Sequence, residues 1–196
     1  MTATAALTQV VETDTLQARV AELGQEIAAD YAGREPVLLG VLNGAVPFLA
    51  DLSRHLPPEI EIDFLSLTRF GEEGRVGIAV DSATPLAGRH VLVVEDIVDT
   101  GLTLSYLLGL LETRDPASLA TVTLVDKVTR RIVDVDLAYR GFEVGDEFLL
   151  GYGLDWEGRY RNLGSLWAVL DLAGFRDDPE MLARRVFANR PDRLPR

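Results

Sequence analysis

Apolar runs alternate with amphipathic stretches through the first 125 residues of the chain. Residues 37–42, 91–95 and 120–125 are almost entirely apolar, which is typical of strands buried on both faces. Residues 59–67 instead alternate between apolar and polar side chains, as expected of a half-exposed strand. Because helical patterns separate these runs, the sequence predicts an α/β fold with a central parallel sheet flanked by helices.

Three helices are predicted among these strands. Apolar residues recur at steps of three and four from Leu16 to Tyr31, which predicts an amphipathic helix with Asp14 as its cap and Gly33 after its end. Residues 46–55 predict a second helix that has Pro47 in its first turn. Residues 102–112 predict a third helix.

The remaining segments are less regular. Residues 68–81 contain three glycines and little periodicity, so they predict a mobile loop or a loosely held hairpin. Strands are expected near 139–143, 147–152 and 166–171, and a short helix at 179–187. We expect a single domain over residues 1–196, with residues 1–12 and 188–196 flexible.

The charge and composition restrict the partners of the chain. A formal net charge of −12 disfavours binding to nucleic acid and to anionic membrane surfaces, so neither is expected as a partner. The absence of cysteine excludes disulfides, thiolate chemistry and cysteine-based metal sites. No apolar stretch approaches the roughly 18 residues of a membrane span, and no signal peptide is recognised. We therefore expect a cytoplasmic protein.

Residues 91–104 carry the strongest chemical signal in the sequence. The apolar run leads into Glu95 and Asp96, and an Asp-Thr-Gly turn at 99–101 precedes the predicted third helix. This turn follows a predicted parallel strand, at the edge where open α/β sheets bind ligands. Backbone N–H groups at a helix start suit a phosphate, and carboxylates suit sugar hydroxyls, a metal or both. The segment predicts a phosphorylated sugar bound with a divalent cation, although a solvated acidic rim would have the same pattern.

The string Glu-Asp, two apolar residues, Asp-Thr-Gly and Thr resembles the phosphoribosyl-pyrophosphate signature of type I phosphoribosyltransferases. The resemblance implies the fold of that family, a central parallel sheet flanked by helices with a small hood. It also implies that this segment binds the phosphoribosyl group through Glu95, Asp96, Asp99, Thr100, Gly101, Leu102 and Thr103.

Four further segments between residues 36 and 171 resemble the hypoxanthine-guanine branch of this family. Residues 40–45 resemble a loop that contains a cis peptide and presents backbone N–H groups to pyrophosphate, which implies roles for Asn43 and Gly44. Residues 126–131 and 160–163 resemble stretches with basic residues on the pyrophosphate side, which implies such roles for Arg131 and Arg161.

The same resemblance implies a purine site. Lys127 matches a lysine that contacts the oxo group of the base. Residues 147–156 resemble the hood segment, in which an aromatic ring stacks on the purine, the next residue reads the ring edge through its backbone, and an aspartate binds magnesium. The implied base-binding residues are Ile97, Lys127, Phe148, Leu149 and Asp155.

Two segments depart from the pattern of this branch. Asn43 replaces a lysine, which removes one positive charge from the pyrophosphate loop. Arg69 and Phe70 stand where the family has a Ser-Tyr pair that closes over the ligands. We expect Phe70 to shield the site and Arg69 to bind pyrophosphate in place of the lost charge. Unchanged affinity for phosphoribosyl pyrophosphate in an Arg69→Ala variant would contradict the second expectation.

The implied reaction transfers the 5-phosphoribosyl group from phosphoribosyl pyrophosphate to hypoxanthine or guanine, giving IMP or GMP and pyrophosphate. Asp99, as general base, and Lys127 are the expected catalytic residues. Mg²⁺ is the expected cofactor, bound by Glu95, Asp96 and Asp155. The resemblance also implies a homodimer or homotetramer.

Three other functions fit parts of the same pattern. Another or a modified purine-like base would use the same phosphate chemistry. A catalytically silent regulator that binds phosphoribosyl pyrophosphate would keep the signature, although the charge of −12 and the retained Asp99, Lys127 and Asp155 disfavour it. A general Rossmann-type nucleotide binder is disfavoured because no Gly-x-Gly-x-x-Gly follows the first predicted strand.

Overall fold

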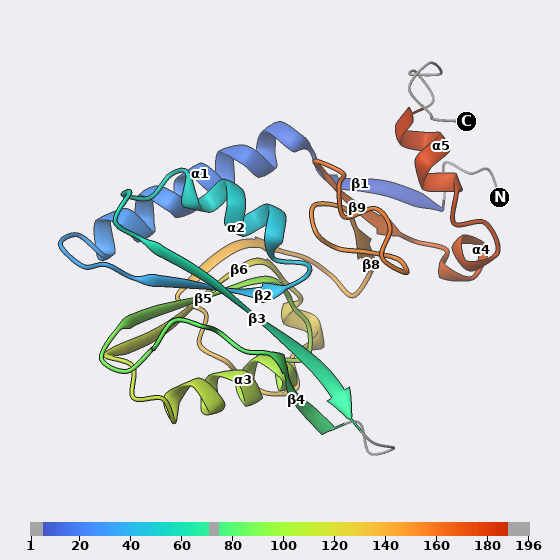
Figure 1. Ribbon diagram of the computed structural model, residues 1–196. Coiled ribbons are helices and arrows are strands. Elements are labelled where there is room, and N and C mark those ends of the chain that lie inside the picture. Colours follow the sequence, from blue (N-terminus) through green and yellow to red (C-terminus); the bar gives the residue numbers. More distant parts are fainter. Residues whose placement is uncertain (1–5, 71–74, 188–196) are drawn as a thin grey trace.

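The larger of two sheets forms the centre of the molecule (Figure 1). The computed structural model describes residues 6–70 and 75–187, and within them six strands are ordered β4-β3-β2-β5-β6-β7. Their bounds are Val37–Leu42 (β2), Glu61–Phe70 (β3), Arg75–Val80 (β4), His90–Val98 (β5), Ser118–Asp126 (β6) and Tyr139–Glu143 (β7). Neighbouring strands are parallel except for the edge strand β4, which is antiparallel to β3. The predicted α/β fold with a central parallel sheet is confirmed.

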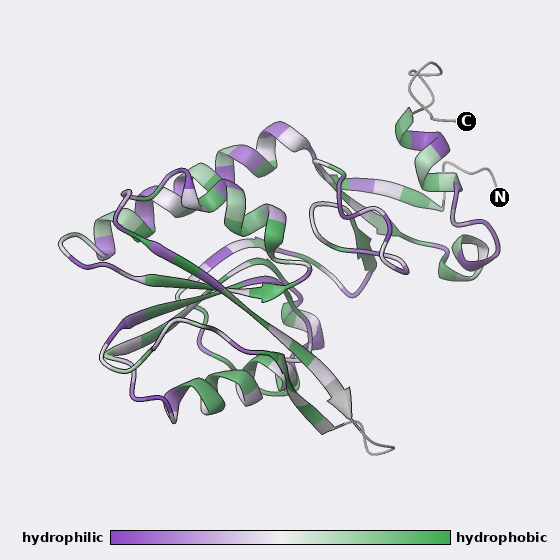
Figure 2. Cartoon of the chain, in the orientation of Figure 1, coloured by the Kyte–Doolittle hydropathy of each residue, from purple (hydrophilic) through white to green (hydrophobic). Residues whose placement is uncertain are grey.

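Helices cover both faces of this sheet (Figure 1). Helices α1 (Thr13–Asp30) and α2 (Val46–Ser53) pack on one face, against alternate strand residues such as Leu38 and Leu92. Helix α3 (Leu102–Glu112) packs on the other, against Val37 and Val91. Burying each such aliphatic side chain contributes on the order of 2 kcal/mol. In Figure 2 the central strands, which helices cover on both faces, are hydrophobic along most of their length, whereas α1 has both hydrophobic and hydrophilic residues.

A smaller antiparallel sheet forms a hood beside the central sheet (Figure 1). Its order is β1-β9-β8, with β1 at Leu7–Val11, β8 at Phe148–Leu150 and β9 at Leu166–Val169. Two short helices, α4 (Leu172–Asp177) and α5 (Met181–Phe187), bury Phe175 and Leu182 with this sheet in a core of their own. The hood therefore joins a segment near the start of the chain to segments near its end.

Several local expectations are wrong. Residues 7–11 are not flexible, because they pair with β9 and bury Leu7. Helix α1 begins at Thr13 after Glu12, whose side chain makes no capping bond, so Asp14 is not the cap. Helix α4, which the sequence did not predict, follows Asp171, and that carboxylate accepts a hydrogen bond from Gly174 N.

The irregular segment 68–81 is a hairpin in its described part. Residues 67–70 of β3 pair with residues 75–78 of β4, while residues 71–74 lie outside the described residues. Residues 1–5 and 188–196, whose flexibility was expected, also lie outside them. Within the described ranges, no helix combines the length and the apolar character that crossing a membrane requires.

Candidate active site

Strand β5 carries the acidic pair at the centre of the site. The sequence predicted a strand over 91–95, whereas the strand continues to Val98, so Asp96 lies within it together with Glu95. Because successive strand residues face opposite sides, the pair is divided. Glu95 lines a cavity of about 230 Å³ together with Ile97 and the turn at 99–101. Asp96 faces Gly44, in the loop that follows β2.

Both carboxyl groups hold their protons more tightly than usual. Burial raises the pKa of Glu95 well above its usual value, and the charge of Asp96 adds to the effect. Burial also raises the pKa of Asp96 to about 6, although a hydrogen bond from Ile97 N (2.8 Å) and the charge of Arg161 favour its ionised form. A cation or a set of hydroxyl donors would relieve this penalty on the charged carboxylates.

The turn at 99–101 is shaped by a glycine in the left-handed conformation. Gly101 has φ +83°, and a Cβ at this position would stand 2.3 Å from the Val133 carbonyl oxygen. The Thr100 carbonyl accepts hydrogen bonds from the N–H groups of Ile132 (2.9 Å) and Val133 (3.0 Å). Helix α3 starts immediately afterwards at Leu102, whose N–H donates to Thr100 Oγ1 at 3.4 Å, while the N-cap residue Gly101 supplies no side-chain cap. Such a turn is well suited to an anion.

The loop after β2 lies between strand β5 and the hood. The peptide bond between Leu42 and Asn43 is cis, which confirms what the resemblance implied for this loop. A Cβ on Gly44 would stand 1.5 Å from Asp96 Oδ2, and a Cβ on Gly153 (φ +102°) would stand 1.9 Å from the Gly44 oxygen. Strand β5, the loop after β2 and the hood segment therefore pack directly on one another only because both positions are glycine.

Arg161 joins two parts of the hood segment. Its Nη1 donates to the Gly153 oxygen at 2.6 Å, and its Nη2 contacts Asp155 Oδ1 at 2.7 Å. The other Asp155 oxygen accepts a hydrogen bond from Gly158 N at 2.7 Å. A guanidinium fork can hold a carbonyl and a carboxylate at fixed angles, so Arg161 and Asp155 are held as one unit.

A second cleft, of about 430 Å³, opens beside the turn at 99–101. Its lining residues are Asp99, Lys127, Arg130, Asp146, Glu147, Phe148, Val169, Leu170 and Leu172. Lys127 is 7% exposed and donates to the Glu147 oxygen at 2.6 Å. Burial lowers the pKa of Lys127, while the charge of Asp99 opposes that effect. A cationic donor and a carboxylate thus share a cleft with an aromatic wall.

The aromatic wall is itself supported by rings that the sequence motifs did not single out. Phe148 packs edge-on against Trp156, with ring centroids 5.6 Å apart, and Trp156 packs edge-on against Phe175 at 5.4 Å. Such pairs stabilise each other beyond their buried area. The Leu149 side chain is buried in the main core. The aromatic residues in and near the hood segment were the sequence feature from which a supporting role for Trp156 could have been predicted.

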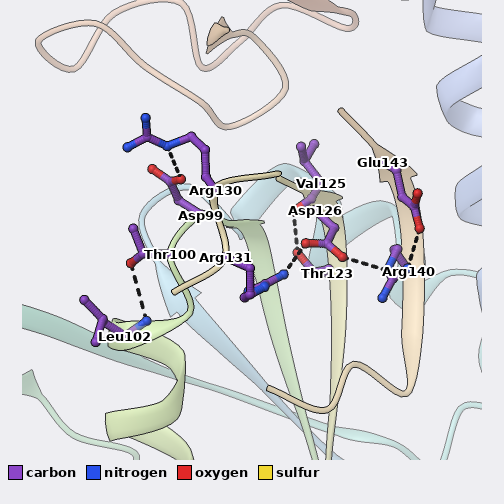
Figure 3. A network of polar contacts seen from close by, with 10 residues as sticks. All are labelled: Asp99, Thr100, Leu102, Thr123, Val125, Asp126, Arg130, Arg131, Arg140 and Glu143. Atoms are coloured by element: carbon purple, nitrogen blue, oxygen red, sulfur yellow. Dashed lines mark hydrogen bonds and ion pairs between the residues drawn. The ribbon is translucent and has the colours of Figure 1, made fainter. Parts of the chain in front are cut away.

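Two consecutive arginines face different carboxylates (Figure 3). Arg131 pairs with Asp126, which is only 1% exposed and also pairs with Arg140 Nε at 2.8 Å. Arg130 instead pairs with Asp99, with 2.6 Å between Nε and Oδ1. The sequence motifs implied a role for Arg131 and none for Arg130.

The structure brings together most, but not all, of the predicted site residues. Ile97 lines the smaller cavity and not the cleft of Lys127 and Phe148. The side chains of Arg69 and Phe70 lie outside the described part of the chain. Among the described residues, no cluster of three acidic or histidine side chains that could hold a metal by itself is present. Glu95, Asp96 and Asp155 therefore do not form one, because adjacent residues of β5 face opposite sides.

Comparison with known proteins assigns this arrangement to a family. Residues 7–157 match the phosphoribosyl transferase domain. The hypoxanthine-guanine phosphoribosyltransferase of Bacillus subtilis is 43% identical over 158 residues, which cover 79% of this chain and 88% of that protein. A crystal structure of the hypoxanthine-guanine phosphoribosyltransferase of Bacillus anthracis is 39% identical and matches with a TM-score of 0.80, covering 83% of this chain and 98% of that one.

The chain belongs to the phosphoribosyltransferase family. Its similarity to the hypoxanthine-guanine phosphoribosyltransferases among its relatives confirms the branch that the sequence motifs indicated. It is also 44% identical over 158 residues to a bifunctional TilS/HprT protein of Listeria monocytogenes, but the match spans only 24% of the length of that relative.

Proposed function

We propose that the chain transfers the 5-phosphoribosyl group of phosphoribosyl pyrophosphate to hypoxanthine, guanine or both, forming IMP or GMP and pyrophosphate in purine salvage. The observation that carries this proposal is the cleft shared by Asp99, Lys127 and Phe148 beside the turn at 99–101. The Lys127 ammonium suits the oxo group of a 6-oxopurine, and the Phe148 ring suits the purine face. Leu149 supplies backbone contacts to the ring edge in this proposal, and Ile97 stays a predicted base contact.

Phosphoribosyl pyrophosphate extends from this cleft along the carboxyl edge of the sheet. Its 5′-phosphate is placed on the backbone N–H groups of residues 99–103, with the Thr100 and Thr103 hydroxyls assisting. The ribose hydroxyls are assigned to Glu95 and Asp96. The pyrophosphate is assigned to the loop of Asn43 and Gly44 and to Arg161, with Arg131 and Arg69 as further predicted contacts. Local donors are needed here because the net charge of −12 repels phosphates.

The chemistry requires no covalent nucleophile on the protein. A ring nitrogen of the base forms a bond to C1′ of the ribose while the bond from C1′ to the pyrophosphate oxygen breaks. Asp99 accepts the proton that the base releases, and Lys127 stabilises the charge on the oxo group. Glu95 and Asp96 hold the ribose in place while positive charge develops on its ring.

A divalent cation, Mg²⁺ in our proposal, fits this site when the ligand supplies part of its coordination. Mg²⁺ usually binds one or two carboxylates together with substrate phosphates, which agrees with the lack of a cluster of three carboxylates among the described residues. Asp155, oriented by Arg161 and Gly158 N, would hold it on the pyrophosphate side, and Asp96 or Glu95 on the ribose side. When bound, the ion would neutralise negative charge on the departing pyrophosphate.

The proposal extends to the setting of the protein. We propose a cytoplasmic homodimer or homotetramer, as the family resemblance implies. We also propose that it binds neither nucleic acid nor membranes, because the net charge of −12 disfavours both.

The test is product formation from phosphoribosyl pyrophosphate and Mg²⁺ with hypoxanthine, guanine, xanthine and adenine in parallel, followed by chromatography. Appearance of IMP or GMP supports the proposal. If product formed only from xanthine or adenine, that base would take the place of hypoxanthine and guanine in the proposal. Binding of phosphoribosyl pyrophosphate without nucleotide from any of the four would favour an unusual base or a regulator, and the replacement of a loop lysine by Asn43 makes that comparison worthwhile.

A further inference from the structure

The turn after β6 points two neighbouring arginines in opposite directions (Figure 3). Arg131 is anchored by the buried Asp126, and its aliphatic stem lies against Gly101, where a Cβ would stand 3.1 Å from Arg131 Cδ. The intervening backbone is a short 3-10 helix, Val128–Arg130, in which Arg130 N donates to the Lys127 oxygen at 2.9 Å. The ion pair of Arg131 and the 3-10 turn together fix the backbone position from which the Arg130 side chain extends.

From this position Arg130 reaches Asp99 at the mouth of the cleft. Nε donates to Asp99 Oδ1 at 2.6 Å, a short charge-assisted hydrogen bond. The two side chains are 45% and 44% exposed, and ion pairs with such exposure contribute little to stability. The contact therefore matters for where the carboxylate points and not for how stable the fold is.

We propose that Arg130 is a positioning residue for Asp99. It holds Oδ1 and thereby presents Oδ2 to the ring nitrogen that releases its proton. Among the described residues, Arg130 is the one hydrogen-bond partner of the Asp99 side chain. This inference rests on the proposed function, since it assigns a task to Arg130 only if Asp99 acts on a base.

The surroundings of Arg130 support an orienting role. Arg130 lines both the cleft of Lys127 and Phe148 and an adjoining hollow of about 590 Å³ that reaches Thr100 and Ile132. It therefore stands between the proposed base cleft and the proposed phosphate turn. A carboxylate free to rotate at this mouth would sample orientations turned away from the base, and each such orientation reduces the fraction of productive encounters.

The test compares Arg130→Ala, Arg130→Lys and the unmodified chain by steady-state kinetics with hypoxanthine and phosphoribosyl pyrophosphate. Arg130→Ala is expected to lower kcat by about tenfold while KM for phosphoribosyl pyrophosphate changes by less than about threefold. Arg130→Lys retains a charge without the directed Nε–H and is expected to recover only part of kcat. Added guanidinium ion is expected to restore part of the rate of Arg130→Ala and to leave the unmodified chain unchanged.

The matched control is Arg89→Ala, which removes a half-exposed arginine paired with Glu61 at 3.0 Å just before β5, at the opposite end of that strand from Asp99. Its kcat is expected to stay within about twofold of the unmodified chain. If Arg130→Ala does not fold, Arg130→Lys and the guanidinium-free Arg130→Gln variant carry the same comparison.

A double-mutant cycle decides whether Arg130 acts through Asp99. In an Asp99→Asn background, Arg130→Ala is expected to change kcat by less than about twofold, because the group that it positions is already inactive. An undiminished tenfold effect in that background would overturn the proposal, as would an unchanged or increased kcat in the normal background. Inactivity of the unmodified chain would instead refute the proposed function.

Discussion

Gly44 and Asp96 approach each other so closely that a Cβ built on Gly44 would stand 1.5 Å from Asp96 Oδ2. The two residues come from the loop after β2 and from β5, neighbouring parallel strands whose carboxyl ends meet at the same edge of the sheet. The proposed pyrophosphate loop therefore rests directly on a carboxylate assigned to the ribose. A change that moves the loop at Gly44 therefore also moves the Asp96 carboxylate, and the reverse holds as well.

Gly44→Ala is accordingly expected to reduce kcat/KM for phosphoribosyl pyrophosphate by on the order of 100-fold, because the methyl group must push the loop or the carboxylate away. Gly109→Ala is the control, since a Cβ at this position in α3 meets nothing within 4 Å. That variant is expected to keep its activity and to gain up to about 1 kcal/mol of stability from helix propensity. Equal activity of both variants would contradict the role of the contact.

Asp96 is expected to make the fold less stable as the pH rises, when no divalent cation is present. Its pKa lies at about 6 in the folded chain and at its ordinary value of 3.8 in the unfolded chain. The folded state therefore binds the proton more tightly, and stability is lost as the pH rises from about 4 through about 6. Asp96→Asn, which does not titrate, should be more stable than the unmodified chain above pH 6 by about 3 kcal/mol.

Urea denaturation between pH 4 and pH 8 in the presence of a chelator measures this difference. The free energy of unfolding of Asp96→Asn minus that of the unmodified chain should grow over the range from about pH 4 to about pH 6 and then level off. A difference that does not change with pH would show that burial of Asp96 carries no such penalty.

The sequence predicted the central sheet because its strands are buried by helices on both faces. Runs such as 91–94 are apolar throughout for that reason, and all four of these residues are fully buried. Strand β1 was not predictable in this way. It is five residues long, and its pairing partner β9 lies more than 150 residues further along the chain.

The same limit applies to the site. The sequence placed the end of this strand at Glu95 because charge interrupts the apolar run, whereas β5 pairs with β6 through Val98. The sequence motifs implied a role for Arg131 and gave no indication that its neighbour Arg130 pairs with Asp99. Which of the two turns inward depends on the buried Asp126, whose own burial depends on the packing of β6 and β7.

Tyr152→Phe is expected to destabilise the chain by about 1–2 kcal/mol. The Tyr152 hydroxyl is buried and donates to Asp51 Oδ2 at 2.7 Å, which connects the hood segment to α2. Burial and the charge of Asp51 raise the pKa of this hydroxyl, so it remains a donor at physiological pH. Tyr106→Phe on α3, where the side chain is 45% exposed, should change stability by less than about 0.5 kcal/mol. Equal midpoints of urea denaturation for the two variants would contradict this assignment.

Asp99→Asn is expected to slow turnover by about 10²–10⁴-fold without abolishing it, because this is the usual contribution of a general base. The variant keeps the shape of the residue, and the turn at 99–101 is held by the bonds of the Thr100 carbonyl and not by the Asp99 side chain. Affinity for phosphoribosyl pyrophosphate, measured by calorimetry, should therefore stay within about threefold of the unmodified chain. Complete loss of that binding would assign Asp99 a structural role instead.

Arg161→Lys tests whether the guanidinium geometry or only the charge is needed on the pyrophosphate side. Arg161 contacts the Gly153 oxygen at 2.6 Å and Asp155 Oδ1 at 2.7 Å with two different nitrogens, and a single ammonium cannot reproduce both directions. KM for phosphoribosyl pyrophosphate is expected to rise by about tenfold or more, and the concentration of Mg²⁺ needed for half-maximal rate should rise with it, because Asp155 loses its orientation. The control is Arg159→Lys, since Arg159, two residues earlier in the chain, forms an exposed pair with Glu180 and should tolerate the change. If Arg161→Lys matched this control in both constants, charge alone would explain the contribution of Arg161 and the fork would have no role in holding Asp155.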